Sequence, residues 1–209
     1  MTARLYLITP PAIDPPVFAD RLKAALDAGD VASLQLRLKD VSDDAICRAA
    51  DMLRPVAQGR DVAFIMNDRP DLALDVGADG VHVGQDDASP ALARRVLGAG
   101  AIVGLSTHAP AELDASVSEP VDYVSAGPVE ATPTKLGRPG TGVTYVTYAV
   151  ERARRPVFVT GGVNPETVSG LAAAGAKCFV VVRFLTESDD PRASARALRR
   201  AIEASTGGN

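Results

Sequence analysis

Residues 64–87, FIMNDRPDLALDVGADGVHVGQDD, decide the fold of this chain. The stretch starts with a short apolar run, Phe64–Met66, and ends with a second one, Val81–Val83. The Ala- and Leu-rich segment between them has helical spacing and is stopped by Gly77. Apolar runs of this length are typical of buried strands. The stretch is therefore predicted to be a strand–helix–strand unit with parallel strands.

Each of these two strands is followed by a carboxylate, Asp68 after the first and Asp87 after the second. Parallel strands joined by a crossover end at the same edge of their sheet, so both carboxylates are expected on one face. Two carboxylates, with a substrate phosphate to complete the shell, suit Mg²⁺. The pair therefore predicts a magnesium site with Asp68 and Asp87 as ligands.

The same unit recurs along the chain, because eight short apolar runs alternate with Ala-rich segments of helical spacing. The runs are Leu5–Ile8, Ala32–Leu38, Phe64–Met66, Val81–Val83, Ile102–Leu105, Tyr123–Ala126, Val157–Thr160 and Cys178–Val182. They predict one α/β domain over residues 1–209, structured over about 4–205 with a short C-terminal tail. The expected fold is a (β/α)8 TIM barrel with its active site at the C-terminal strand ends. An open doubly wound sheet is the alternative, but its glycine fingerprint is not found in the sequence.

Composition limits the partners of the protein. The net charge of −4 argues against nonspecific nucleic-acid binding, and no apolar run reaches transmembrane length. Aromatic residues make up only 4% of the chain and Trp is absent, which predicts an aliphatic core. Cys47 and Cys178 have no metal-binding spacing, so both are expected to be reduced and buried thiols. We expect a cytoplasmic protein with small-molecule substrates and no nucleic-acid or membrane partner, while a homo-oligomer stays open.

The second predicted strand carries Gln35, Arg37 and Lys39 at alternating positions. Alternation directs these three side chains toward the barrel mouth, and it directs Leu36 and Leu38 toward the helices. Polar side chains on a buried face are costly unless they meet a ligand or one another. The three residues are therefore candidates for an anion site, and an internal ion pair with a barrel carboxylate is the alternative.

Three further polar residues lie in or after the central strands. His82 lies inside a strand, where a hydrogen-bonded core histidine is the more common role than a catalyst. The role of His108 stays open between these two. Ser106 stands at a strand end and could hydrogen-bond a heterocycle or cap a turn.

Two glycine-containing loops are candidate anion sites. The loop of residues 127–142, GPVEATPTKLGRPGTG, has the length of a lid or a ligand clamp, with a plain surface loop as the alternative. Within it, Thr132 and Thr134 can donate hydroxyls to a phosphate, and Lys135 supplies a mobile cation. The other loop, residues 161–165 (GGVNP), follows the seventh strand, where barrels of this kind often hold a phosphate. Its Asn–Pro pair is expected to start the next helix, and a tight turn without ligand is the alternative.

Six motifs follow one another in order along the chain. They are QLRxK at residues 35–39, NDRPDLALxVGADGVHxGQxD at 67–87, GxSTH at 104–108, GPVxATPTKxGRP at 127–139, GGVNPE at 161–166 and VVVR at 180–183. In this order, and from the LYLIT strand through the last barrel strand, the chain resembles the thiamine phosphate synthase family. The resemblance implies a transferase that needs Mg²⁺. Such an enzyme joins 4-amino-5-hydroxymethyl-2-methylpyrimidine diphosphate to hydroxyethylthiazole phosphate and releases pyrophosphate.

The resemblance also implies roles for individual residues. The residues implied to bind the diphosphate are Arg37, Lys39, Asn67 and Lys135, and those implied to bind the metal are Asp68 and Asp87. Gln35 and Ser106 are implied to bind the aminopyrimidine. The thiazole phosphate site is implied to consist of Thr132, Thr134, Gly162, Val182 and Arg183. Catalysis is expected to depend on Lys135, Arg37 and Ser106. The chain departs from the family at Leu38, where many members are acidic, and at Arg183, where many carry Ser.

Three alternative functions stay open. A paralogue that isomerises the thiazole phosphate needs no Mg²⁺, and the full diphosphate set argues against it. A barrel without catalysis would bind thiamine precursors or a sugar phosphate as a sensor. An isomerase or aldolase would need a strand-end Glu base or a buried Schiff-base Lys, for which Lys39 is the only candidate.

Overall fold

The strands of the chain form a closed barrel in sequence order, β1 to β8, and each is paired in parallel with its neighbours. The structure is a computed structural model that describes residues 4–131 and 139–207. The strands are β1 (Arg4–Ile8), β2 (Val31–Leu36), β3 (Ala63–Asn67), β4 (Gly80–Val83), β5 (Ile102–Thr107), β6 (Tyr123–Ala126), β7 (Val157–Val159) and β8 (Cys178–Val181). The predicted (β/α)8 barrel is confirmed.

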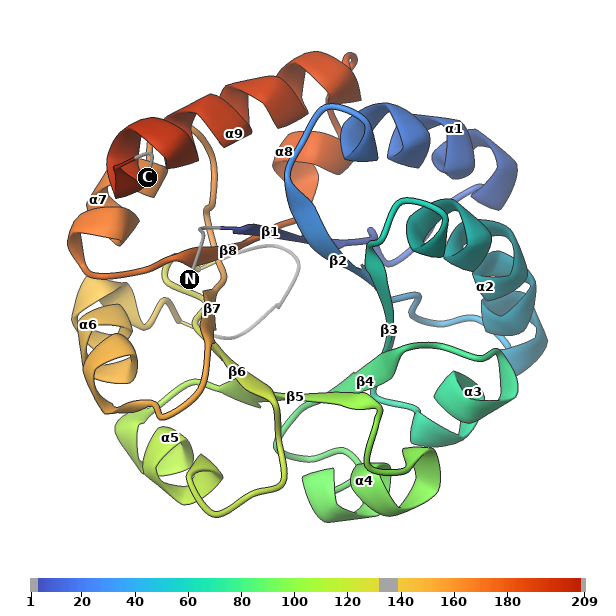
Figure 1. Cartoon of the computed structure of the whole chain (residues 1–209), viewed down its shortest axis with the longest axis horizontal. Helices are drawn as coiled ribbons and strands as arrows, with labels where there is room; N and C mark the ends of the chain where they lie inside the picture. Colours follow the sequence, from blue (N-terminus) through green and yellow to red (C-terminus); the bar gives the residue numbers. More distant parts are fainter. Residues whose placement is uncertain (1–3, 132–138, 208–209) are drawn as a thin grey trace.

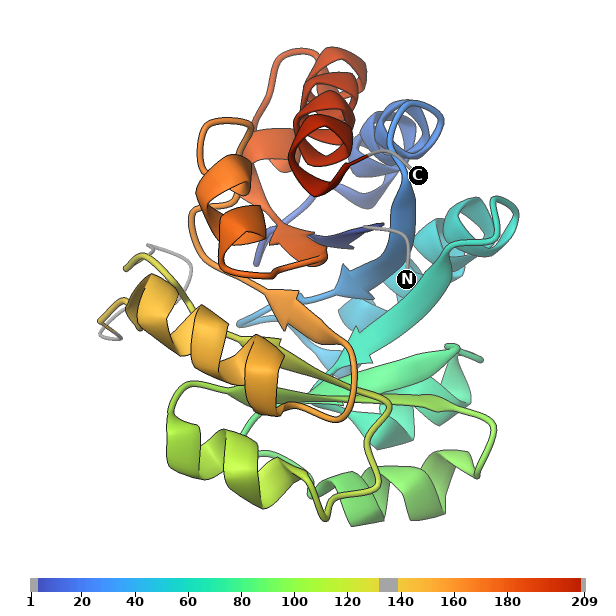
Figure 2. The same ribbon diagram turned by 60° about the vertical axis from the view of Figure 1, so that its left-hand side comes forward.

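Helices surround the barrel on its outer side (Figure 1). They are α1 (Pro15–Leu26), α2 (Asp43–Gln58), α3 (Pro70–Asp75), α4 (Pro90–Leu97), α5 (Pro110–Ser116), α6 (Gly142–Arg152), α7 (Val168–Ala173), α8 (Arg183–Thr186) and α9 (Pro191–Thr206). The last helix, α9, packs beside α1, α7 and α8 (Figure 2). Within residues 4–131 and 139–207, no helix has both the length and the apolar character needed to cross a membrane.

Local sequence signals explain where several helices begin. The side chains of Ser42 and Ser89 each accept a hydrogen bond from the backbone N–H three residues on, at the starts of α2 and α4. Helix α2 runs through Pro55 and continues to Gln58. A proline in the last turn removes one intrahelical hydrogen bond, and the Pro55 carbonyl still accepts from Gly59 N–H at 3.0 Å.

The main core lies between the strands and the helices. The outward side chains of β2 and β3, such as Leu34 and Phe64, pack there against Leu22 and Leu53 of the helices, and all four are buried. Leu36 is buried in the same core and Leu38 packs against it, as strand alternation predicts. The helices cover the outer face of the strands. The polar side chains of the cavity therefore come from the inner face of the barrel and from the ends of the strands.

The barrel interior differs from the expected aliphatic core. A small separate cluster fills it, formed by Tyr6, Ile65, Tyr123 and Val180, with Phe158 packed against them. Both tyrosines are buried, and their ring centroids lie 5.8 Å apart. The prediction of an aliphatic core is therefore right for the outer layer and wrong inside the barrel.

The two cysteines differ in burial. Both are free thiols; Cys178 is buried in β8, whereas Cys47 is half-buried on α2. The expectation that both are buried is therefore correct for Cys178 only.

Candidate active site

A cavity of about 710 Å³ opens where the strands end. Every predicted site residue within the described ranges lines it, and these are Gln35, Arg37, Lys39, Asn67, Asp68, Asp87, Ser106, Gly162, Val182 and Arg183. Thr132, Thr134 and Lys135 lie outside the described residues. Residues spread over most of the sequence thus meet in one cavity, as expected for strand ends of a barrel.

Asp68 lies at the end of β3 in a network of polar contacts. Its backbone adopts a left-handed conformation, φ 62°, which Asp tolerates better than most residues. Its backbone N–H donates to the His82 carbonyl at 2.8 Å, which ties it to β4. Its carboxylate accepts from Lys39 Nζ at 2.7 Å and from the side-chain amide of Asn67. The residue is therefore held through its backbone by β4 and through its carboxylate by Lys39 and Asn67.

Asp87 lies beside Asp68 after β4. Its Oδ2 accepts from the Gly84 N–H at 2.8 Å. Partial burial raises the pKa of Asp87, and the neighbouring Asp68 carboxyl raises it further. Two carboxylates in contact repel each other when both are ionised, so the pair favours a bound cation.

The donor set fits Mg²⁺ better than a transition metal. Among residues 4–131 and 139–207, no group of three or more His, Cys, Asp or Glu side chains is arranged to hold a metal ion. A divalent ion on Asp68 and Asp87 would need further oxygen ligands from water and substrate. Mg²⁺ is commonly held in this way. The magnesium site stays a prediction that these residues can satisfy.

Arg37 and Lys39 follow β2 and lie at the rim of the cavity. Burial lowers the pKa of Arg37, and the charge of Asp68 opposes that shift. The backbone N–H of Arg37 donates to Thr9 Oγ1 at 2.9 Å, which anchors the end of β2 to the end of β1. Lys39 forms an ion pair with Asp68, as the alternative interpretation of this strand expected. Arg37 and Lys39 nevertheless both line the open cavity, so both can also contact a ligand.

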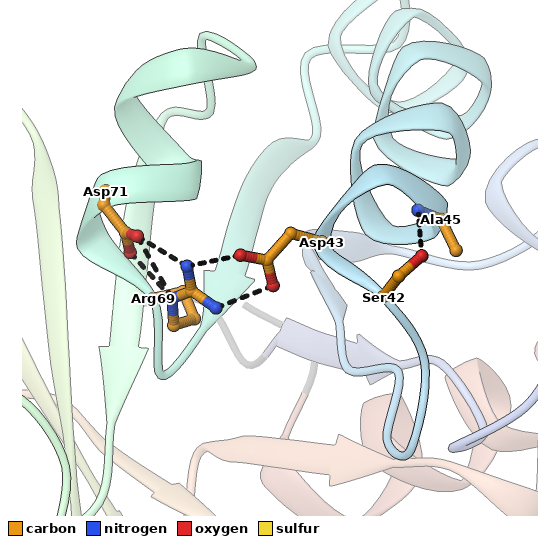
Figure 3. Close-up of polar contacts among 5 residues, drawn as sticks. All are labelled: Ser42, Asp43, Ala45, Arg69 and Asp71. Atoms are coloured by element: carbon orange, nitrogen blue, oxygen red, sulfur yellow. Dashed lines mark hydrogen bonds and ion pairs between the residues drawn. The ribbon is translucent and has the colours of Figure 1, made fainter.

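The arginine next to Asp68 holds two other carboxylates (Figure 3). Arg69 Nη1 and Nη2 each lie 2.8 Å from one oxygen of Asp43, the first residue of α2. Its Nε and Nη2 bind Asp71 at 2.9 and 2.6 Å. These contacts raise the pKa of Arg69 and lower the pKa of both carboxylates. Arg69 therefore fastens the loop that carries Asp68 to the start of α2.

We expect Arg69→Gln to raise the Mg²⁺ concentration needed for activity while changing the free energy of unfolding little. Arg69 and its two carboxylate partners are largely exposed, so the loss of these contacts should change the unfolding free energy little. The loop with Asp68 would be held less firmly, so the Mg²⁺ concentration for half-maximal activity should rise by about threefold. Arg60→Gln is the matched control, because it removes a similarly exposed ion pair with Asp27 and neither residue lines the cavity. An equal effect of both variants on Mg²⁺ use would contradict this role.

The floor of the cavity is polar and buried. The predicted site residues Gln35 and Ser106 lie there, together with His82, Tyr6 and Tyr123. His82 contacts Ser106 and Tyr123, so the expected core histidine is also a wall of the cavity. Sequence reasoning missed the two tyrosines, because a tyrosine inside an apolar strand looks like an ordinary core residue.

The loop after β7 forms another side of the cavity. Gly161 and Gly162 both adopt positive φ, 98° and 76°, which favours glycine. A Cβ on Gly162 would lie 2.5 Å from Glu130 Oε2, so a larger residue there would require the exposed Glu130 side chain to move. Val182 and Arg183 line the same side, so Arg183 adds a cation to this part of the cavity.

Helix α7 begins later than the predicted start at Asn164, although the Asn164 side chain makes the contacts expected of a capping residue. The Asn164 side chain accepts from the backbone N–H groups of Glu166 and Thr167, at 2.8 and 3.1 Å. These bonds close a turn, and α7 begins only at Val168. Thr167 Oγ1 donates to the Gly162 carbonyl at 2.8 Å, which holds the glycine loop against this turn.

His108 joins the ends of two strands. Its ring Nδ1 pairs with the Gly127 carbonyl after β6, and its backbone N–H donates to Glu112 at 2.7 Å. It lines the cavity as well. These contacts suit a residue that supports the wall of the cavity. They agree with the first of the two roles left open by the sequence, a hydrogen-bonded structural histidine rather than a catalyst.

A closed parallel barrel with cations, paired carboxylates and a glycine loop around one cavity defines a TIM-barrel enzyme that acts on phosphorylated small molecules. The family model described as thiamine monophosphate synthase matches residues 5–185. The chain belongs to this family.

Individual relatives agree with the family. A thiamine-phosphate synthase of Rhodospirillum centenum is 51% identical over 179 residues, which are 85% of this chain and 86% of that protein. One of Thermus thermophilus is 42% identical over 205 residues, covering 97% and 98%. The solved structure of a thiamine phosphate pyrophosphorylase from Pyrococcus furiosus superposes with a TM-score of 0.86 at 26% identity and covers 98% of each chain. The predicted thiamine-phosphate synthase function is confirmed at this level; Mg²⁺ and the residue roles stay predictions.

Proposed function

We propose that the chain condenses 4-amino-5-hydroxymethyl-2-methylpyrimidine diphosphate with hydroxyethylthiazole phosphate in the cavity at the strand ends. The observation that carries this proposal is the meeting of Arg37 and Lys39 with the paired carboxylates Asp68 and Asp87 around one cavity. Such a set suits a diphosphate bound with a divalent cation. The products are thiamine phosphate and pyrophosphate.

The leaving pyrophosphate determines what the protein must supply. The bond between the pyrimidine methylene carbon and the diphosphate oxygen breaks, and both electrons leave with pyrophosphate. The electron-rich aminopyrimidine stabilises the remaining carbocation, which the thiazole nitrogen captures with its lone pair. No proton leaves the attacking nitrogen, so the reaction needs no general base there.

Charged groups at the rim stabilise the charge that develops on the leaving group. In this proposal Arg37, Lys39 and Asn67 bind the diphosphate oxygens, and Lys135 joins them from outside the described residues. Groups placed in advance where charge develops contribute strongly to catalysis. Asp68 and Asp87 would hold Mg²⁺, which when bound supplies further positive charge to the pyrophosphate.

The remaining residues hold the two reactants next to each other. Gln35 and Ser106 would bind the aminopyrimidine at the floor of the cavity. Gly162, Val182 and Arg183, with Thr132 and Thr134 outside the described residues, would bind the thiazole phosphate. Holding two reactants in reacting geometry itself lowers the barrier.

Pyrophosphate release is the measurement that tests this proposal. It should require both substrates and Mg²⁺, should stop when EDTA removes the metal, and should yield thiamine phosphate in equal amount. Isomerisation of the thiazole phosphate without pyrophosphate would favour the paralogous isomerase. Tight binding with neither reaction would favour a sensor.

Lys135→Ala is expected to lower kcat by one or more orders of magnitude. The reason is the loss of a lysine ammonium that is proposed to act on the departing pyrophosphate. Single-turnover release of pyrophosphate measures the effect on the chemical step. Wild-type turnover in this variant would remove the 127–142 loop from the mechanism.

A further inference from the structure

Five buried side chains form one hydrogen-bonded chain across the floor of the cavity. They come from five strands and follow in the order Gln35 (β2), Tyr6 (β1), Tyr123 (β6), His82 (β4) and Ser106 (β5). Successive polar atoms lie 3.2, 2.9, 3.0 and 2.9 Å apart. The exposed fraction of each residue is at most 9%, so water competes little for these contacts. Gln35 and Ser106, the two ends, are the residues proposed to bind the pyrimidine.

The orientation of the Gln35 amide gives this chain a direction once the protons are counted. Gln35 Nε2 donates to the Tyr6 oxygen, so the single Tyr6 proton is free to go to the Tyr123 oxygen. In this direction Tyr123 donates its own proton to His82 Nδ1, which lies 3.0 Å from the Tyr123 oxygen. An accepting Nδ1 means that neutral His82 carries its proton on Nε2 and donates to Ser106 Oγ. The Ser106 proton is then left to point into the cavity.

The protonation of the two phenols supports this count. Burial raises the pKa of Tyr6 and of Tyr123, so both keep their proton throughout the neutral range. Each can therefore donate one hydrogen bond and accept another. With the Gln35 amide as donor at one end, every contact of the chain can be given one donor and one acceptor.

Gly104 provides the space in which Tyr123 reaches His82. In the strand register it lies between these two residues, paired with His82 on one side and Tyr123 on the other. A Cβ at this position would lie 2.1 Å from Tyr123 Cζ and 2.6 Å from His82 Nδ1. The rings of His82 and Tyr123 stack at 5.5 Å, and Phe158 packs edge-on against Tyr123. The contact is thus built by several strands.

We propose that Tyr6, Tyr123 and His82 are positioning residues that orient the two ends of the chain. They leave Gln35 Oε1 as an acceptor and the Ser106 hydroxyl as a donor toward the cavity. A ligand must then present a donor to Gln35 and an acceptor to Ser106. A 4-aminopyrimidine does so with its amine and a ring nitrogen, whereas a 4-oxopyrimidine has a carbonyl in place of the amine. This selectivity rests on the proposed function. The direction of the hydrogen-bonded chain is independent of the proposed function.

The proton position on His82 tests the direction in the free protein. The chain has two histidines, so ¹⁵N NMR of the imidazole nitrogens gives two sets of signals, and His108→Gln assigns them. We expect the Nε2–H tautomer at neutral pH for His82. In Tyr123→Phe the Nδ1 atom loses its donor, so this tautomer preference should weaken. A wild-type His82 with its proton on Nδ1 would overturn the proposal, whatever the activity of the enzyme.

Kinetics test the selectivity. Tyr6→Phe and Tyr123→Phe should each reduce the preference in kcat/KM for the 4-amino over the 4-oxo pyrimidine diphosphate by about tenfold. Tyr145→Phe is the matched control, because this buried tyrosine donates to Thr107 Oγ1 at 2.8 Å and is not part of the chain. Unchanged selectivity in both test variants would overturn the proposal. Absence of any reaction in the wild type would instead refute the proposed function and leave the NMR result valid.

Discussion

Replacing Asp68 and Asp87 together by Asn is expected to lower kcat/KM for pyrophosphate release by at least about a hundredfold at a Mg²⁺ concentration that saturates the wild type. The two carboxylates lie side by side, and partial burial, followed by the neighbouring Asp68 carboxyl, raises the pKa of Asp87. An amide pair has no negative charge and attracts a divalent cation weakly. Asn also tolerates the left-handed backbone at position 68, so the fold should be retained.

A Mg²⁺ titration of pyrophosphate release measures this effect. The variant should show a much higher half-saturating concentration or no response to the metal. Asp61→Asn is the matched control, because Asp61 also adopts a left-handed backbone, φ 56°, and does not line the cavity. A double variant with the wild-type response to Mg²⁺ would show that the metal does not bind these carboxylates.

Replacing Arg37 by Gln is expected to lower kcat by about two to three orders of magnitude. Arg37 is half-buried at the end of β2, and burial lowers its pKa, so it lies in a partly desolvated position beside Asp68. A charge there acts on the departing pyrophosphate with little screening. Lys should restore only part of the activity, because its ammonium cannot bind two phosphate oxygens in one plane.

Comparing chemistry with binding separates this role from a loss of structure. Single-turnover pyrophosphate release should slow in Arg37→Gln, while binding of the thiazole phosphate alone stays unchanged. Arg94→Gln is the matched control, since Arg94 binds Asp122 at 2.8 Å and does not line the cavity. It should lower stability and leave kcat close to that of the wild type. Equal turnover in the two variants would be incompatible with a leaving-group role for Arg37.

Short-range patterns predicted most of the fold and the rim of the cavity. Strands and helices are recognised from the spacing of apolar residues that are close in sequence. The apolar runs before Asp68 and Asp87 therefore reveal where two strands end. In a parallel barrel all strand ends point the same way, so any polar residue after a strand is a site candidate. Boundaries were less certain: Pro55 lies inside α2, and Asn164 closes a turn before α7.

The sequence by itself determined the order of strands and helices, the edge at which Arg37, Lys39, Asp68 and Asp87 meet, and the family. Only the tertiary structure decided the polar floor. Tyr6 and Tyr123 are 117 positions apart, and their hydrogen bond exists because barrel closure brings β1 and β6 to face each other across the interior. No local pattern distinguishes such tyrosines from apolar core residues, since the partner of each hydroxyl is chosen by the curvature of the whole sheet.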